Sequence, residues 1–132
     1  MNTRNNRIGH QDEYVLNRAS VRSVWNQITT SKGLSEWFAP NVRIDSKNIY
    51  VEWDKLGDRR DGTITEIEKD KLIKWVWNDD KNSYLSIEIV KTELTSTVSI
   101  LVDDHDVGMD PLTLEQLWER HIEELRHSLG IE

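Results

Sequence analysis

The spacing of apolar residues changes twice along this chain, and these changes divide it into predicted elements. Residues 1–11 are polar without a pattern and predict a flexible N-terminal tail. The run DEYVLN (12–17) has the composition of a first strand. Ser20 then predicts a helix N-cap. Apolar residues follow it at the spacing of one helix face, namely Val21, Val24, Trp25 and Ile28.

A second short helix is predicted within the stretch GLSEWFAP (33–40), after the interruption TTSKG. Leu34, Trp37 and Phe38 fall on one side of this helix. It must end near Pro40, because the residue before a proline is pushed out of the helical region.

Between residues 42 and 102 the apolar residues alternate with polar ones, which is the period of β-strands. The alternation slips between Ile64 and Ile67, and this slip predicts a β-bulge. Short turns between the strands favour an antiparallel meander. The turn and loop segments are DSKN (45–48), EKDK (68–71), NDDKN (78–82) and ELTS (93–96).

The helical period returns over residues 112–129, where Asp110 can cap the helix and Pro111 suits its first turn. Gly130 follows as a C-terminal cap residue. An antiparallel sheet with one apolar face needs a cover, and this helix has a stripe of the right length. The pattern predicts an α+β fold: a curved antiparallel β-sheet of about six to seven strands wrapped around a long C-terminal helix, with two short helices after the first strand. The stripe consists of Leu114, Leu117, Trp118, His121, Ile122, Leu125 and Leu129.

Composition narrows the class of protein. A length of 132 residues fits one domain, expected over residues 12–132. No apolar run approaches the roughly 20 residues of a membrane span, and the start lacks the apolar segment of a signal peptide. Without cysteine the chain has no disulfide or thiolate site, which is compatible with a cytoplasmic location. A net charge of −7 argues against nucleic-acid binding. No motif indicates a cofactor.

Six of the ten aromatic residues are Trp, and most of them converge in the predicted fold. Alternation places Trp53, Trp75 and Trp77 on one sheet face, with Trp118 on the helix opposite. They either fill the core or line an apolar cavity. Both interpretations are correct if some of the tryptophans pack in the core and others line the cavity. Six indole N–H groups are hard to satisfy in a dry core, which favours a cavity. The candidate ligand-binding residues are Trp37, Phe38, Trp53, Trp75, Trp77, Leu85, Trp118, His121, Ile122 and Leu125.

The other candidate sites carry weaker signals. His121 lies on the apolar stripe, either as a hydrogen-bonded core residue or as an acid–base group, whereas His127 is expected to face solvent. Their separation of six residues does not suit a shared metal. DDHD (103–106) lacks the calcium-loop pattern and is interpreted as a solvated loop. DKLGDRRDG (54–62) lacks the P-loop pattern and is interpreted as a hairpin loop. No metal site is predicted.

Several stretches together resemble the START-like, or SRPBCC, superfamily with its helix-grip fold. They are YVLN, GLSEWFAP, VEW with IKWVW, ELTSTVSILVDD and LWERHIEELRHSLG, and the resemblance spans about residues 12–131. It is greatest for homologues of the heat-shock-protein ATPase activator. The resemblance implies a cavity between the curved sheet and the last helix. Relatives hold lipids, sterols, polyketides or hormones there, and others act as co-chaperones.

Three functions are therefore open. The first is non-catalytic binding of a small hydrophobic ligand in the cavity. The second is a co-chaperone-like interaction with a chaperone protein, for which the charged loops 54–62 and 78–82 would be the contact surface. The third is a cyclase-like enzyme, which needs an acid–base group such as His121, Glu52 or Asp54. An open sheet edge is compatible with a dimer, but the sequence leaves the oligomeric state open.

Overall fold

The computed structural model describes residues 9–53 and 57–131 and contains one seven-stranded antiparallel sheet with three helices. The order of strands in the sheet is β1-β7-β6-β5-β4-β3-β2. The first strand therefore pairs with the last one at one edge. The elements are β1 (His10–Val15), α1 (Val21–Thr29), α2 (Ser31–Trp37), β2 (Asn41–Asp45), β3 (Asn48–Glu52), β4 (Arg59–Glu68), β5 (Leu72–Trp77), β6 (Tyr84–Thr92), β7 (Thr97–His105) and α3 (Pro111–Ser128).

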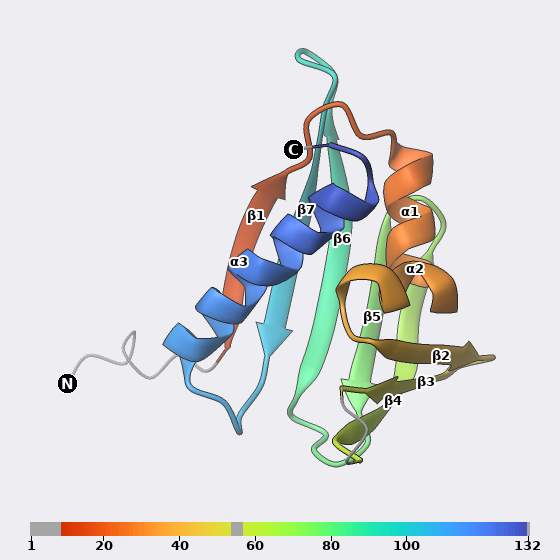
Figure 1. The fold of residues 1–132 in the computed structure, drawn as a ribbon, viewed down its shortest axis with the longest axis vertical. Helices are drawn as coiled ribbons and strands as arrows, with labels where there is room; N and C mark the ends of the chain where they lie inside the picture. Colours follow the sequence, from red (N-terminus) through yellow and green to blue (C-terminus); the bar gives the residue numbers. More distant parts are fainter. Residues whose placement is uncertain (1–8, 54–56, 132) are drawn as a thin grey trace.

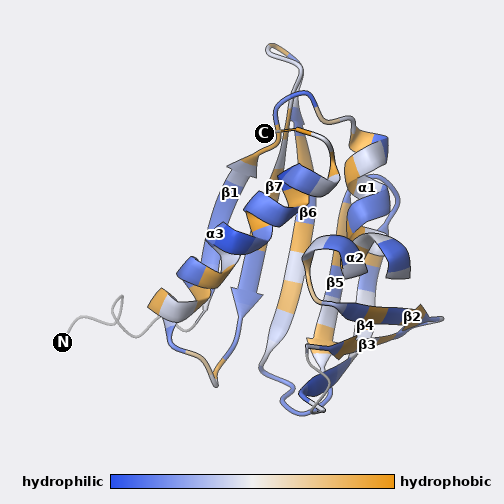
Figure 2. Ribbon diagram, in the orientation of Figure 1, coloured by the Kyte–Doolittle hydropathy of each residue, from blue (hydrophilic) through white to orange (hydrophobic). Residues whose placement is uncertain are grey.

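All three helices lie on one face of the sheet (Figure 1). Helix α3 crosses the part of the sheet formed by β1, β7 and β6, and α1 and α2 lie beside it, where α1 contacts β6 and α2 contacts β2. Figure 2 shows the apolar positions alternating along β5 and β6. The inward-facing residues of the strands and the buried side of α3 form one core, to which α3 contributes Trp118, Ile122 and Leu125. This is the predicted helix-grip arrangement. Within the described chain, no helix is both long and apolar enough to cross a bilayer.

The predicted helix starts and the bulge are confirmed. The Ser20 side chain accepts a hydrogen bond from the Ser23 backbone N–H at 3.1 Å, and Asp110 accepts one from the Thr113 N–H at 3.2 Å. The register of β4 against β5 shifts between Ile64 and Glu66. These signals are local, because a cap depends on the first turn of its helix and a bulge on one extra residue in a strand.

The first strand begins earlier than the run 12–17 predicted. His10 pairs with Asp104 and Val15 with Ser99, so β1 ends where its partner β7 begins. Leu16 is buried in the core beyond the end of β1. Residues 1–8 of the expected tail lie outside the described residues, whereas residues 10 and 11 belong to β1. Pairing with a distant strand, rather than local composition, determines where this strand starts.

Helices α1 and α2 are separated by the single residue Thr30, a shorter interruption than TTSKG predicted. The Thr30 hydroxyl accepts a hydrogen bond from the Gly33 N–H at 2.9 Å and caps α2. A Cβ atom on Gly33 would lie 2.7 Å from Cα of Gln27 and would also collide with the Asn26 carbonyl oxygen. Glycine therefore allows the two helices to approach closely, which fixes the position of Trp37 and Phe38.

Two segments interpreted as loops are partly strand. Residues 54–56 lie outside the described residues, but β4 already begins at Arg59. The interpretation of DDHD (103–106) as a solvated loop is wrong, because residues 103–105 belong to β7 and both Asp104 and Asp106 are buried. Each buried carboxylate has a partner in another element, and the sequence alone does not show these partners.

Candidate functional site

A cavity of about 420 Å³ is lined by the start of β4, the end of β5, the start of β6, the end of β7 and the first part of α3. This volume falls within the range of roughly 300 to 1,000 Å³ that is typical of small-molecule sites. The residues around it come from the end of α2, from four strands and their connections, and from α3. They are Phe38, Trp53, Asp58, Arg59, Arg60, Trp77, Asp79, Leu85, Asp104, Asp106, Met109, Leu114, Leu117 and His121.

One side of the cavity is an aromatic wall formed by Phe38, Trp53 and Trp77. The ring centroids of Phe38 and Trp53 are 6.4 Å apart, and those of Trp53 and Trp77 are 6.3 Å apart. Both separations are typical of aromatic pairs in contact. Trp53 is half-buried and Trp77 is buried, so Trp53 leaves more of its surface for another molecule.

The ten candidate residues divide into two sets. Five of them line the cavity: Phe38, Trp53, Trp77, Leu85 and His121. The other five are buried in the core outside the cavity lining: Trp37, Trp75, Trp118, Ile122 and Leu125. Both interpretations of the tryptophans therefore apply to different members of the set.

Hydrogen bonding explains how the core tryptophans are accommodated. Nε1 of Trp37 donates to the Gln27 carbonyl oxygen at 2.9 Å, and Nε1 of Trp118 donates to Oδ2 of Asp104 at 2.8 Å. Among buried side-chain polar atoms of the described residues, Nε1 of Trp75 alone lacks a partner. Trp75 packs against Gly62, whose missing side chain leaves room for the indole ring.

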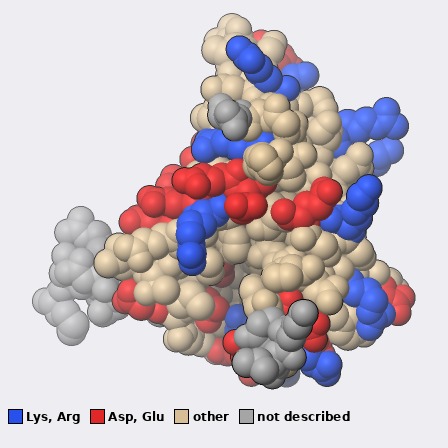
Figure 3. Space-filling model, in the orientation of Figure 1, with Lys and Arg blue, Asp and Glu red and all other residues tan. Residues whose placement is uncertain are grey.

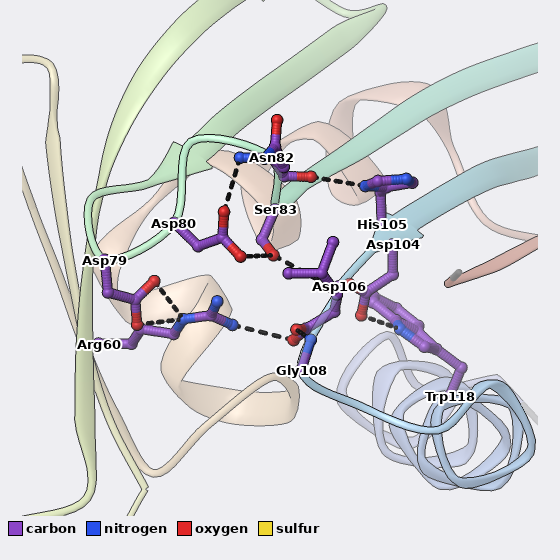
Figure 4. Close-up of polar contacts among 11 residues, drawn as sticks. Arg60, Asp79, Asp80, Asn82, Ser83, Asp104, His105, Asp106, Gly108 and Trp118 are labelled. Atoms are coloured by element: carbon purple, nitrogen blue, oxygen red, sulfur yellow. Dashed lines mark hydrogen bonds and ion pairs between the residues drawn. The ribbon is translucent and has the colours of Figure 1, made fainter. Parts of the chain in front are cut away.

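Beside the aromatic wall the cavity lining is polar, and Arg60 organises this part through its ion pairs (Figure 4). The Arg60 guanidinium contacts Asp79 at 2.9 Å and Asp106 at 3.0 Å. It also lies 4.7 Å from the centre of the Trp77 ring, which is a cation–π distance. Arg60 thus joins the polar and aromatic sides, and its charge is already compensated.

Asp104 projects from β7 toward α3 (Figure 4), and the residue is only 9% exposed. Its Oδ2 atom accepts the hydrogen bond of Trp118, whereas Oδ1 has no hydrogen-bond partner among the described residues. Burial raises the pKa of Asp104 from 3.8 to about 6, although the Trp118 hydrogen bond opposes this rise. The carboxylate is therefore costly to hold in its ionised form.

His121 lies on α3 between aromatic rings. Its ring centroid is 5.0 Å from that of Trp118 and 5.3 Å from that of Phe38. Burial lowers the pKa of His121 from 6.5 to about 4, against the effect of a hydrogen bond with the Trp37 backbone. His121 is consequently neutral at pH 7, whereas His127 is exposed as expected.

Sequence reasoning missed Arg60, Asp104 and Asp106 as members of the site. The available signal was alternation: Asp104 and Asp106 continue the inward positions of Ile100 and Val102 along β7. Two acidic residues at inward positions indicate polar groups buried at a strand end.

The remaining acid–base candidates are Glu52 and Asp54. Glu52 accepts a hydrogen bond from Asn41 at 3.2 Å and does not line the cavity, and Asp54 lies outside the described residues. The part of the chain that the structure describes contains no cluster of three or more potential metal ligands. Chemically, the cavity offers an apolar wall next to a group of carboxylates.

Comparison with solved structures identifies the same fold in bacterial proteins. The Aha1 dimer from Colwellia psychrerythraea superposes with a TM-score of 0.73 at 14% identity, covering 92% of this chain and 96% of that one. Protein BfR322 from Bacteroides fragilis gives a TM-score of 0.61 at 30% identity, covering 89% of this chain and 88% of that one. Protein MLL2253 from Mesorhizobium loti gives a TM-score of 0.71 at 15% identity, covering 91% and 95%.

The family is established by sequence. The family model of the START-like superfamily domain matches residues 5–131, so the chain belongs to this superfamily. No curated protein matches it. The likeness to the Aha1 dimer, at 14% identity, concerns the fold alone.

Proposed function

We propose that this START-like domain binds a small hydrophobic molecule in the cavity without catalysing a reaction. The single observation that carries the proposal is the cavity of about 420 Å³ with aromatic and aliphatic walls. Phe38, Trp53 and Trp77 provide the aromatic part, and Leu85, Leu114 and Leu117 provide the aliphatic part. Removing apolar ligand surface from water would drive binding by about 25 cal/mol per Å².

The experiment that tests this proposal is a native mass spectrum of the freshly purified protein, compared with its denatured mass. An additional mass that disappears on denaturation would support ligand binding. Equal masses, also after exposure to fatty acids, sterols and aromatic compounds, would contradict it. That outcome would leave the co-chaperone-like interaction with a chaperone protein as the function to test next.

Replacing Trp53 distinguishes a role in the cavity from a role in the core. Trp53 is half-buried and suits this test better than Trp77, which is only 3% exposed. We expect Trp53→Ala to reduce retention of the bound molecule at least about tenfold, equivalent to about 1.4 kcal/mol, while the fold remains. Native mass spectrometry measures retention, and circular dichroism measures the fold.

The matched control is Trp25→Ala. Trp25 is also a half-buried tryptophan, but it lies on α1 outside the cavity lining. Retention should survive this substitution. Equal loss in both variants, or unfolding of Trp53→Ala, would assign Trp53 to the core and count against the proposed site.

A further inference from the structure

Building on the proposed ligand-binding function, we infer that the ligand is an amphipathic amine. Its apolar body would lie against Phe38, Trp53 and Trp77, and its ammonium group would donate a hydrogen bond to Oδ1 of Asp104. The inference depends on the placement of one open acceptor, on the charges around it and on the aromatic faces beside it.

Asp104 provides the acceptor. The residue lines the cavity, is 9% exposed, and has a single partner, the Trp118 indole, on Oδ2. Oδ1 has no hydrogen-bond partner among the described residues. It also keeps some accessible surface, because it is not among the fully buried polar atoms that lack a partner. Because Asp104 belongs to the cavity lining and keeps an open acceptor, a hydrogen-bond donor of a ligand in the cavity has a carboxylate oxygen with which to pair.

The charges around the cavity favour a cation. Its lining contains four aspartates, at positions 58, 79, 104 and 106, and two arginines, at positions 59 and 60. Arg60 is occupied by Asp79 and Asp106, so it does not neutralise Asp104 through a direct contact. His121, on the α3 side, is neutral at pH 7, since burial lowers its pKa to about 4. Asp104 thus has no ion-pair partner among the described residues, although the Arg60 charge acts on it from a distance, and an ammonium group would supply a direct partner.

The same charges disfavour an anionic ligand such as a fatty acid. The Arg60 charge is already balanced by Asp79 and Asp106, which contact the guanidinium at 2.9 Å and 3.0 Å, so a ligand carboxylate gains little from it. Arg59, the other cation of the lining, is exposed, and an ion pair with an exposed side chain contributes little. A ligand carboxylate would also approach the carboxylate of Asp104. Like charges in a partly desolvated site repel each other strongly.

The aromatic wall supports the same class of ligand. A cation over the face of a tryptophan is attracted by the ring quadrupole, and Trp77 already binds Arg60 in this way. Phe38 and Trp53 have no such cation within cation–π distance among the described residues. Aromatic faces beside a carboxylate are a combination that recognises ammonium groups.

The outer surface of α3 is rich in acidic residues. Figure 3 shows Asp and Glu side chains gathered along the course of α3, with Lys and Arg side chains among them. Glu115 and Glu119 are exposed residues of this helix. Together with the net charge of −7, they give the molecule a field that attracts cations and repels anions.

Three compounds that share one apolar body, a phenyl ring with four methylene groups, test the inference: 4-phenylbutylamine, 4-phenylbutanol and 5-phenylvalerate. Their affinities are measured by isothermal titration calorimetry at about pH 8, where the amine and Asp104 are both charged. We expect the amine to bind at least about tenfold more tightly than the alcohol, and the carboxylate to bind most weakly. Tighter or equal binding of the alcohol or the carboxylate would overturn the amine class and leave hydrophobic binding intact.

The variant Asp104→Asn removes the charge and keeps the shape and an acceptor for Trp118. It should abolish the preference for the amine over the alcohol. The control Asp103→Asn removes the same charge from the neighbouring residue, whose carboxylate accepts from the Tyr84 hydroxyl at 3.2 Å and does not line this cavity. It should keep the preference, and loss of the preference in both variants would contradict the role of Asp104.

Two further outcomes distinguish failure of the amine inference from failure of the proposed ligand-binding function. If Asp104→Asn does not fold, the ligand series on the unaltered protein still decides the class of ligand. If none of the three compounds binds, the amine class is overturned. The native mass spectrum then decides independently whether the domain binds any hydrophobic molecule.

Discussion

At the scale of single residues, Asp104 and His121 line the same cavity, but they make the stability of the fold depend on pH in opposite directions. Burial raises the pKa of Asp104 to about 6 and lowers that of His121 to about 4. Both shifts express the same fact, that the folded protein disfavours a charge at either position. In the pH range of about 4 to 6 their effects on stability oppose each other.

The variant Asp104→Asn should reveal how Asp104 makes the stability of the fold depend on pH. The pKa of Asp104 rises from 3.8 in a fully solvated chain to about 6 in the folded protein, so ionisation destabilises the fold. Relative to the unaltered protein, the variant should gain stability as the pH rises from about 4 to about 6, by up to about 3 kcal/mol. Urea unfolding at both ends of this range measures the gain. A stability difference that does not change with pH would contradict the buried carboxylate.

The variant His121→Gln should show the opposite slope. The pKa of His121 falls from 6.5 to about 4 on folding, so the unfolded chain binds the proton more readily between these values. The unaltered protein should therefore lose stability relative to the variant as the pH falls from about 6.5 to about 4, by an amount on the order of 1 to 3 kcal/mol. The exposed His127 supplies the control substitution, His127→Gln. Equal slopes for both histidine variants would show that His121 is solvated.

Prediction of the site from sequence reached the apolar residues but not their polar partners. Alternation alone placed Trp53 and Trp77 on the inner face. The contact between Asp104 and Trp118 joins β7 to α3, and the contact between Arg60 and Asp106 joins segments 46 residues apart. Such pairings depend on how the sheet bends, and no local pattern encodes that.

At the scale of elements, Gly33 controls the junction of α1 and α2. The backbone of α1 occupies the space that a side chain would need, with Cα of Gln27 at 2.7 Å from the position of a Cβ atom. This close approach also sets the hydrogen bond from the Trp37 indole to the Gln27 carbonyl. The stretch GLSEWFAP therefore places its two aromatic residues through a glycine near its start.

The substitution Gly33→Ala distinguishes packing from helix propensity. Propensity alone predicts a gain of about 1 kcal/mol, because alanine is the better helix former. We expect a loss of about 1 to 3 kcal/mol instead, because the two helices must separate. Chemical denaturation measures the change. As control, Gly108→Ala should have little effect, since the nearest neighbour of its added Cβ atom is Oδ1 of Asp106 at 3.6 Å, and a stabilised Gly33→Ala would contradict the close approach.

At the scale of the whole molecule, the bend of the sheet brings together segments that are not neighbours in it. Strands β5 and β6 separate β4 from β7, yet Arg60 of β4 lies 3.0 Å from Asp106, the residue after β7. The ion pair of Arg60 therefore links β4 to the end of β7 across the curved sheet, at the end where the cavity lies. The curvature itself followed from the sequence, because a long apolar helix needs a sheet that wraps around it.

Removing Arg60 should weaken this link. We expect Arg60→Met to cost roughly 3 kcal/mol, because it leaves Asp106 buried without its cation. Thermal and urea unfolding measure the loss. The neighbouring Arg59 is exposed, and Arg59→Met should change stability by no more than about 0.5 kcal/mol. If Arg59→Met and Arg60→Met are equally stable, the ion pairs do not hold the sheet closed.

The pairing of β1 with β7 has a consequence for the synthesis of the protein. The ribosome makes His10–Val15 long before Thr97–His105, and at roughly 5 to 20 residues per second the interval lasts several seconds. During this time the nascent β1 has no partner, and the apolar faces of β5 and β6 lack their cover α3. The growing chain thus presents unpaired strand edges and an uncovered apolar sheet face to the cell, and we expect a nascent-chain chaperone to engage it until β7 and α3 have emerged.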